Sequence, residues 1–504
     1  MINVIGENLY GAANICSKEG QNPLTAMFGA DETLLGKGYA IYCLFEDRDN
    51  KKIKIIRADF EVDKVLEYPS LTPLLPAAAW YEREIYDMFG IKPIGHPDLR
   101  PLVLHQTFPE GYHPLLKNVS ATKQVHGNRN YNMITSSGEG VFEVAVGPIH
   151  AGIIEPGHFR FSQAGESMLQ LDAKLFYTHR GIEKTLEGMN VNEAIYLIER
   201  VCGACSVSNT LSYCMAIEKL SEVKVSRRAW LIRMVVSELE RLYNHVSDTG
   251  NLSSGVGFSQ VVNQGSALKE KLMRCNEVVT GSRFLRGMIA LGGVNLDIDY
   301  KIAKYIEKTL KEVEEVYPKL FTMMYDNENF LNRIKTTGIV RTKTAKDLAM
   351  VGVGARGSGI STDSRKDLVY GLYNEVEFDK IVYDGCDVEA RLLVRGDEVF
   401  QSIKIIRQLL AKLYELDEKP SENLKVKLGK LKTETLSYGL NESARGSNLN
   451  CLILDKDEKI YRCFIRSASY PNWPSLPIAI QGDIIPDFPL INKSFELCYA
   501  CLDR

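Results

Sequence analysis

The chain of 504 residues has no apolar run long enough to cross a membrane and no marked excess of either charge. Its longest weakly charged stretch, residues 467–482, contains three prolines, whereas a spanning helix needs about 20 consecutive apolar residues. Residues 1–20 lack the basic segment and apolar core of a signal peptide. With 61 basic against 64 acidic residues, the chain also lacks the positive charge of a nucleic-acid-binding protein. We therefore expect no membrane span in this chain and no nucleic acid among its partners.

The cysteine content excludes a further class, the small secreted proteins held together by disulfides. Such frameworks place an even number of cysteines at close spacing in a short chain, whereas this long chain has eleven. Four of them form two CxxC pairs, Cys202-Gly-Ala-Cys205 and Cys498-Tyr-Ala-Cys501. In a reducing cytosol, paired cysteines indicate metal or redox chemistry. We expect the other seven to be ordinary reduced residues: Cys16, Cys43, Cys214, Cys275, Cys386, Cys451 and Cys463.

The spacing of the pairs leaves two kinds of site open. CxxC lets both sulfurs face one ion, and Gly203 leaves room for the tight turn. A structural zinc site with four cysteine ligands is the commonest use of two such pairs, but zinc ribbons usually place them roughly 15–20 residues apart. Here more than half of the chain separates Cys205 from Cys498. This favours a buried cofactor site that the C-terminal pair completes, with a zinc site joining distant segments as the alternative.

The residue pattern predicts an α+β chain of two domains. Residues 1–115 should form a small α+β domain, because the runs 39–45 and 52–57 are rich in β-formers. Residues 116–140 lack periodicity and are predicted to be a linker. Residues 141–504 should form a larger, mainly helical domain that opens with a strand pair at 142–161 and returns to β-like segments from about Leu449. An apolar period near 3.6 predicts its helices at 192–220, 228–246, 298–317 and 396–416.

One motif, Gly352-Val-Gly-Ala-Arg-Gly357, satisfies the GxGxxG pattern of dinucleotide-binding proteins. The pattern indicates a nucleotide site only between a strand and the start of a helix. Here a helical pattern precedes it at 344–350 and no helix start follows. We therefore do not expect this chain to bind nicotinamide.

Five separated motifs surround or include the cysteine pairs. They are Gly147-Pro-Ile-His-Ala-Gly-Ile-Ile-Glu-Pro-Gly-His-Phe-Arg-Phe161, Arg180-Gly-Ile-Glu183 with Arg200-Val-Cys-Gly-Ala-Cys205, Glu442-Ser-Ala-Arg-Gly446, Tyr470-Pro-Asn-Trp-Pro474 and Cys498-Tyr-Ala-Cys-Leu-Asp-Arg504. Together they resemble the large subunit of nickel–iron (NiFe) hydrogenases of the complex I-related, membrane-associated group 4, which is related to the forty-nine-kilodalton subunit of complex I.

The N-terminal domain has a resemblance of its own. Tyr81-Glu-Arg-Glu-Ile-Tyr-Asp-Met-Phe-Gly90 and His96-Pro-Asp-Leu-Arg100 are similar to the thirty-kilodalton subunit of complex I. A fusion of this subunit with the hydrogenase-like one resembles the large subunit of formate hydrogenlyase and hydrogenase-4. The resemblance runs from about residue 40 to residue 504.

The resemblance implies a nickel–iron centre whose iron carries CO and cyanide. Cys202 and Cys498 would be terminal nickel ligands, while Cys205 and Cys501 would bridge nickel to iron. Thiolates suit both soft metals. The remaining cysteines lack the spacing of an iron–sulfur cluster, so we expect that cluster in a partner small subunit.

The resemblance also assigns residues around the metals. Glu155 corresponds to the glutamate that relays protons, and Arg445 to the arginine that faces the reactive gap. Standing alone, each would more often be a solvated or helix-end residue. His158 is expected close to the site, while His150 could equally be structural. Asn209 takes the place of a histidine after the second cysteine, where it could donate a hydrogen bond to sulfur but cannot accept a proton at neutral pH.

The C-terminal end departs from other hydrogenase branches. Glu183 corresponds to a glutamate that can bind magnesium with a terminal histidine, but this chain ends in Arg504. An ion pair between the two side chains can replace the metal, which leaves magnesium in doubt. Ending at Arg504 fits either removal of a C-terminal extension or a chain encoded without one. Further departures, whose effect on activity stays open, are Asn450, Ser443-Ala444 and Glu496-Leu497.

These features predict the catalytic large subunit of a NiFe hydrogenase on the cytoplasmic side of the membrane. Its expected partners are an iron–sulfur subunit like the twenty-kilodalton subunit of complex I, ferredoxin-like subunits and antiporter-like membrane-arm subunits, with formate or ferredoxin oxidation as the source of electrons. A complex I-like subunit without nickel and a structural zinc assembly module with four cysteine ligands are the alternatives. The direction of turnover, the electron donor and ion pumping depend on the partners.

Overall fold

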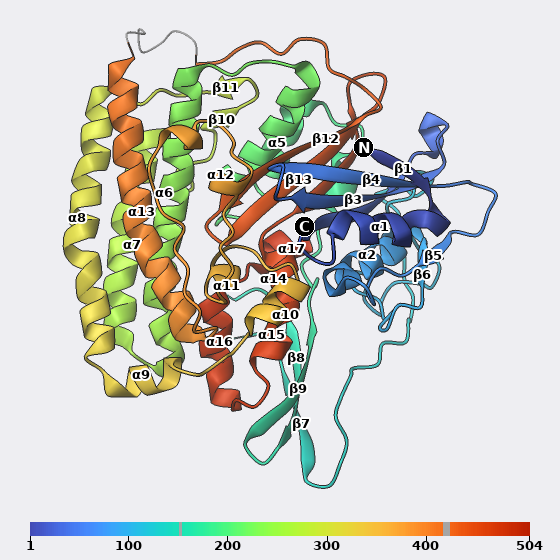
Figure 1. Cartoon of the computed structure of the whole chain (residues 1–504), viewed down its shortest axis with the longest axis horizontal. Coiled ribbons are helices and arrows are strands. Elements are labelled where there is room, and N and C mark those ends of the chain that lie inside the picture. Colours follow the sequence, from blue (N-terminus) through green and yellow to red (C-terminus); the bar gives the residue numbers. More distant parts are fainter. Residues whose placement is uncertain (151–153, 417–423) are drawn as a thin grey trace.

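The N-terminal part is built on a four-stranded sheet in the order β1-β4-β3-β2 (Figure 1). The protein is described here by a computed structural model that covers residues 1–150, 154–416 and 424–504. Strands β2, β3 and β4 pair antiparallel, and β1 pairs parallel with β4. The two strands predicted at 39–45 and 52–57 are confirmed within β3 and β4. The elements are β1 (Ile2–Ile5), α1 (Leu9–Ser17), β2 (Leu24–Asp31), β3 (Tyr39–Asp47), β4 (Lys52–Phe60), β5 (Glu67–Pro69), α2 (Ala79–Phe89) and β6 (Lys92–Ile94).

Helix α2 joins this sheet to the rest of the chain. It packs on β2, and Gly90, with φ of +74°, ends it in the left-handed conformation that glycine adopts without strain. Its charged residues Glu82, Arg83 and Glu84 are buried together with its apolar ones. A surface helix would expose a polar face, so α2 lies between two packed bodies.

An antiparallel sheet of β7 (Val141–Val146), β8 (His158–Ala164) and β9 (Ser167–Lys174) projects from the molecule (Figure 1). It follows residues 95–140, which contain no helix or strand. The predicted strand pair at 142–161 is confirmed, with a third strand added. Residues 151–153, which belong to the motif Gly147–Phe161, lie outside the described residues.

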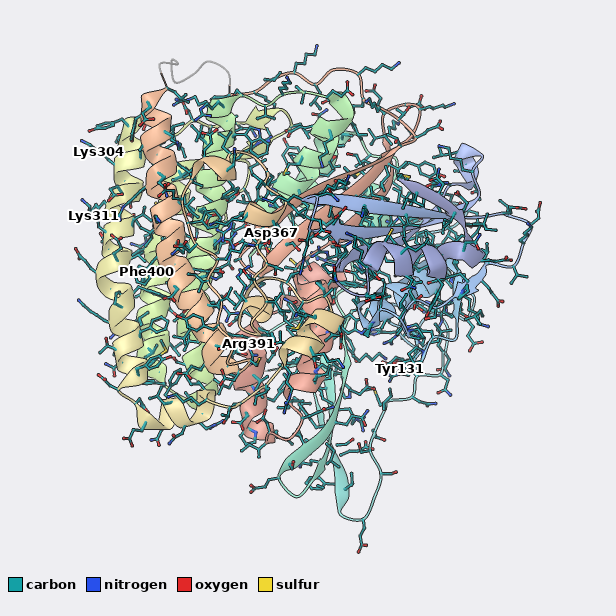
Figure 2. The ribbon with its side chains drawn as sticks, in the orientation of Figure 1. Tyr131, Lys304, Lys311, Asp367, Arg391 and Phe400 are labelled. Carbon is teal, nitrogen blue, oxygen red and sulfur yellow. The ribbon has the colours of Figure 1, made fainter. Side chains whose placement is uncertain are left out.

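Four long helices form the bundle on the side away from the N-terminal sheet (Figure 1). They are α6 (Arg227–Leu252), α7 (Ser259–Thr280), α8 (Tyr300–Tyr325) and α13 (Val388–Glu415). In α8 the apolar stripe faces its neighbours, while Lys304 and Lys311 point outward (Figure 2). The helix predicted at 298–317 is confirmed, but it begins later, at Tyr300, because Asp299 caps it. It also ends later, at Tyr325, because Pro318 is accommodated inside it.

The helix predicted at 192–220 is wrong as one element. It is two helices, α4 (Val191–Ile198) and α5 (Ser206–Ser221), separated by residues 199–205. The break carries Cys202 and Cys205, and Cys205 is the N-cap of α5. The sequence does not mark the break, because apolar residues recur through it and on both sides.

The final segment contains a three-stranded antiparallel sheet of β12 (Leu436–Ser443), β13 (Gly446–Leu454) and β14 (Ile460–Arg466). It begins earlier than the predicted Leu449. Strand β12 is buried continuously from Gly439 to Ser443, and α5 packs on it so closely that a Cβ on Gly439 would lie 1.9 Å from the Ser212 carbonyl oxygen. Four short helices follow: α14 (Ser469–Asn472), α15 (Leu476–Ala479), α16 (Phe488–Phe495) and α17 (Tyr499–Asp503).

Shorter elements complete the fold, and the two parts share one core. The Phe28 ring from β2 stacks on the Phe464 ring from β14, with centroids 4.6 Å apart. The predicted α+β class is confirmed, while the domain boundaries stay a prediction.

Within the described ranges, no helix is both long and apolar enough for a membrane crossing. The remaining elements are α3 (Ile182–Leu186), β10 (Ile289–Ala290), β11 (Gly293–Val294), α9 (Glu328–Ile334), α10 (Thr342–Asp347), α11 (Gly352–Arg356) and α12 (Ser364–Asp367).

Candidate metal centre

The two CxxC pairs meet in the interior of the molecule. The Sγ atoms of Cys202 and Cys501 are 2.7 Å apart, and those of Cys202, Cys498 and Cys501 all lie within 4.8 Å of one another. Cys205 belongs to the same buried cluster. The structure therefore brings together the four cysteines that the motifs singled out.

Each pair sits where a loop turns into a helix. The Cys205 N–H donates to the Cys202 sulfur at 3.2 Å, just before α5 begins. In the same way, the Cys501 N–H donates to the Cys498 sulfur at 3.4 Å, and Cys498 is the N-cap of α17. Backbone N–H groups at a helix start favour the thiolate. Both turns thus direct a backbone N–H at the first sulfur of the pair.

Proximity makes the four thiols titrate together. Contacts with neighbouring sulfurs, assisted by the positive charge of Arg445, lower the pKa of Cys205 and of Cys498 well below the ordinary value. The same sulfur contacts raise the pKa of Cys202 and Cys501. The remaining protons are therefore shared between neighbouring sulfurs, as between Cys501 and Cys202. A bound metal cation would replace these protons, because cysteine binds metals as the thiolate.

Arg445 lies beside this cluster on the turn between β12 and β13. Its Nη1 donates to Asn244 Oδ1 at 3.1 Å, its Nη2 is 3.7 Å from Asp248, and its Nε donates to the Glu496 carbonyl oxygen. Asn244 and Asp248 are one helical turn apart on α6 and were missed by the sequence analysis. Their i, i+4 spacing on a buried helix face was the available signal.

The Arg445 turn is supported by a glycine of the GxGxxG motif. Gly352 has φ of +63°, and a Cβ there would lie 2.0 Å from the Arg445 carbonyl oxygen. The motif itself forms the short helix α11, with α10 and no strand before it. Gly352 is therefore required by a close backbone approach, which agrees with the absence of a nucleotide-binding context.

Glu155 reaches the second cysteine pair from the loop between β7 and β8. Its Oε2 accepts the Ala500 N–H at 2.7 Å, midway between Cys498 and Cys501. Partial burial, together with the nearby charge of Cys498, raises the pKa of its carboxyl group. The side chain is thus placed to hold a proton next to the sulfur cluster.

Two histidines and one asparagine singled out from the sequence make hydrogen bonds near the cysteine-bearing segments. His158 Nδ1 hydrogen-bonds to the Gly147 carbonyl oxygen and His150 Nε2 to that of Gly157, so both brace the β7–β8 loop. Asn209 lies one turn beyond Cys205 and accepts a hydrogen bond from Asn448 at 2.9 Å. Its buried Nδ2 has no hydrogen-bond partner among the residues that the structure describes.

Glu183 and Arg504 form an ion pair. The Arg504 Nη1 is 2.8 Å from Glu183 Oε1, and its Nη2 is 2.7 Å from Glu84 of α2. Arg462 occupies the other oxygen of Glu183 at 2.7 Å. Two arginines thus neutralise the carboxylate that the resemblance assigned to magnesium.

The donor set fits a soft metal centre. Four thiol groups converge, two have lowered pKa, and a second polar layer of Arg445 and Glu155 adjoins them. Thiolates are preferred by nickel, iron and zinc, whereas magnesium and calcium prefer oxygen. The seven other cysteines are free thiols outside this cluster: Cys16, Cys43, Cys214, Cys275, Cys386, Cys451 and Cys463.

Comparison with known proteins identifies three family regions. Residues 2–125 match the family "respiratory-chain NADH dehydrogenase, 30 Kd subunit", and residues 255–504 match its "49 Kd subunit" counterpart. Residues 180–280, which include the first cysteine pair, match "nickel-dependent hydrogenase". From the N-terminus to the C-terminus, the three matched regions come in the same order as the motifs that resemble them.

Similar whole proteins combine the same regions. Formate hydrogenlyase subunit 5 of Escherichia coli is 33% identical over 488 residues, which cover 95% of this chain and 84% of that protein. Hydrogenase-4 component G of E. coli is 33% identical over 487 residues with the same coverage. A chain of the membrane-bound sulfane sulfur reductase, an archaeal respiratory membrane complex, superposes with a TM-score of 0.67 at 27% identity, covering 73% of this chain and 99% of that one. The chain belongs to the family of hydrogenase large subunits that fuse the thirty- and forty-nine-kilodalton-like parts of complex I and that includes formate hydrogenlyase subunit 5 and hydrogenase-4 component G.

Proposed function

We propose that this chain is the catalytic large subunit of a membrane-associated NiFe hydrogenase that forms H2 from protons and electrons and can oxidise it. The observation that carries the proposal is the convergence of two distant CxxC pairs on one buried point. Complex I-like scaffolds need no such thiol cluster. The match of residues 180–280 to nickel-dependent hydrogenases supports the same conclusion.

The four cysteines would hold the two metals. Cys202 and Cys498 would bind nickel alone, and Cys205 and Cys501 would bind both nickel and iron. When bound, such a centre, with CO and cyanide on its iron, supplies the site where H2 is split or formed. The chain contributes the thiolates, whose turns direct backbone N–H groups at the sulfurs.

The proton route would begin at Glu155. Its Oε2 is engaged by the Ala500 N–H, so we assign Oε1 as the atom that takes up and releases the proton. The raised pKa of this carboxyl group keeps it protonated closer to neutral pH, which suits a relay. Arg445, held by Asn244 and Asp248, would present its positive charge to the cluster and keep the thiolates ionised.

Partner subunits would supply the rest of the electron path. We propose an iron–sulfur small subunit of the type of the twenty-kilodalton subunit of complex I. Ferredoxin-like subunits would bring electrons from formate or ferredoxin, and antiporter-like subunits would lie in the membrane. The chain would lie on the cytoplasmic face of the membrane and attach through these partners. The relatives from a formate hydrogenlyase and from an archaeal respiratory membrane complex support this arrangement.

Metal analysis of the purified complex, combined with infrared spectroscopy, tests the proposal. Nickel and iron together with CO and cyanide stretching bands are expected. Zinc alone would overturn it in favour of a structural site with four cysteine ligands, and absence of any bound metal would overturn it in favour of a complex I-like scaffold. H2 production from a reduced viologen dye measures the activity in the same preparation.

A further inference from the structure

Helix α2 of the N-terminal part reaches the last residues of the chain through a buried carboxylate. Glu84 accepts a hydrogen bond from Arg504 Nη2 at 2.7 Å, and the two residues are only 6% and 3% exposed. The opposite side of the same guanidinium binds Glu183 at 2.8 Å and the Ile465 carbonyl oxygen at 2.9 Å. Arg504 therefore connects the two parts of the molecule through buried ion pairs, and removing one partner of such a pair leaves a buried charge uncompensated.

This connection lies immediately beside the second cysteine pair. Arg504 follows α17, the five-residue helix that contains Cys501 and is capped by Cys498. A helix of this length has too few internal hydrogen bonds to keep its position by itself. Its position therefore depends on the side chains that anchor it.

The same helix α2 also supports the other end of the pair. The Tyr81 ring stacks on the Tyr470 ring, with centroids 4.7 Å apart and an angle of 25° between the planes. Tyr470 follows Ser469, whose hydroxyl oxygen accepts the Cys498 N–H at 2.9 Å. Two residues one helical turn apart on α2 thus act on both ends of the Cys498–Cys501 segment.

We propose that Glu84 is a positioning residue for the C-terminal cysteine pair, so that docking of the N-terminal domain sets the geometry of the metal ligands. Glu84 touches none of the cysteines. It acts through Arg504, while Tyr81 acts through Tyr470 and Ser469. This inference rests on the proposed metal role of the four cysteines, although the positioning itself concerns the protein alone.

The geometric part can be tested in the full chain produced in nickel-depleted medium. Iodoacetamide alkylation of each cysteine is followed by peptide mass spectrometry for the wild type, Glu84→Gln, Glu84→Asp and Lys37→Gln. Lys37 forms a different ion pair between the two parts, with Glu434 at 3.3 Å, and is the matched control. In Glu84→Gln we expect alkylation of Cys498 and Cys501 to accelerate about tenfold through local opening, with Cys202 and Cys205 unchanged. Glu84→Asp should recover most of the protection, and Lys37→Gln should match the wild type.

Wild-type rates in Glu84→Gln, or equal acceleration at all four cysteines, would overturn the proposal. If Glu84→Gln does not fold, Tyr81→Leu decides by the same criterion of selective acceleration at the C-terminal pair. In the assembled complex, the nickel content per chain should fall in Glu84→Gln and stay at the wild-type level in Lys37→Gln. A wild-type complex without nickel would refute the proposed function, whereas the alkylation contrast would still decide the role of Glu84.

Discussion

The sulfur atoms of Cys202 and Cys501 lie 2.7 Å apart although 299 positions separate the two residues. Both belong to turns in which a backbone N–H points at a cysteine sulfur. Because thiolates in a buried cluster repel one another, such a site is stable only with shared protons or a bound cation. Because the sulfurs of the two pairs are in contact, the site requires the second cysteine pair as much as the first.

Replacing Cys498 with Ser should abolish H2 turnover and remove nickel from the protein. A hydroxyl is a poorer ligand for a soft metal than a thiolate, and three cysteines cannot complete the set. Nickel and iron contents, together with dye-linked H2 production, measure the effect. Cys386→Ser changes a free, partly exposed thiol and serves as the control. Retained nickel and activity in Cys498→Ser would disprove the ligand assignment.

The Glu155→Gln variant should lose proton transfer while keeping its metals. The amide cannot pass a proton onward, and the loss of a general acid–base group costs about 10²–10⁴-fold in rate. Exchange between D2 and water should slow accordingly, whereas conversion of para- to ortho-H2, which needs no proton exit, should persist. Glu143→Gln, at an exposed position of β7 paired with Arg160, should behave as the wild type. Unchanged D2–water exchange in Glu155→Gln would exclude this residue as the relay.

Substitution of Gly352 by Ala should destabilise the protein and disturb the Arg445 turn. The left-handed backbone costs alanine about 1–2 kcal/mol, and the new Cβ would approach the Arg445 carbonyl oxygen to 2.0 Å. We therefore expect a loss of more than about 2 kcal/mol in the free energy of unfolding, with reduced H2 turnover. In Gly354→Ala the close contact is with the flexible end of Met350, and the Phe495 ring lies at an ordinary 3.5 Å, so the change should cost less than about 1 kcal/mol. Urea denaturation of both variants compares them, and equal effects would contradict the close-approach explanation.

Stability should decrease in mildly acidic solution because of His105. Burial is the main cause that lowers the pKa of this imidazole to about 4, and its Nε2 hydrogen-bonds to the Leu175 carbonyl oxygen at 2.7 Å. Between the ordinary pKa of 6.5 and about 4, the unfolded chain binds a proton that the folded chain does not. Stability is therefore lost as the pH falls through this window, by about 2–3 kcal/mol from this group.

Urea denaturation at pH 7.5 and pH 4.5 measures that slope. His105→Gln should make the pH dependence shallower by the stated amount, since glutamine keeps a donor for Leu175 and cannot be protonated. His126→Gln, at an exposed histidine, should keep the wild-type slope. An identical slope in His105→Gln and the wild type would assign the acid sensitivity to other groups.

Local sequence was a good guide to the regular elements and a poor guide to the breaks. Helix α8 follows its apolar stripe because burial on one face imposes a period. Strand β3, buried on both faces, and strand β4 follow their runs of β-formers. The break at residues 199–205 has no such signal, since apolar residues recur through it and on both sides. Strand β12 was missed because its residues from Gly439 to Ser443 are all buried, so no alternation between core and solvent marks them.

Within the candidate site, the chemically distinctive residues could be predicted from the sequence. The residues that hold them in place could not. The CxxC pairs, Glu155 and Arg445 stand in recognisable motifs. Asn244 and Asp248, which hold Arg445, lie on the largely buried helix α6 and share an i, i+4 spacing that belongs to no motif. Glu84 lies within a motif of the N-terminal domain, but nothing in that motif indicates Arg504 as its partner.

The sequence by itself determined the positions of the cysteine pairs, the order of the motifs, the α+β class and the family. Tertiary structure alone decided that sulfurs 299 positions apart touch, that Arg504 is neutralised by Glu183 and Glu84, and that α2 supports both ends of the last cysteine pair. The physical reason is range: periodicity and capping act within a few residues, whereas these contacts arise only when separate segments bury their side chains against one another.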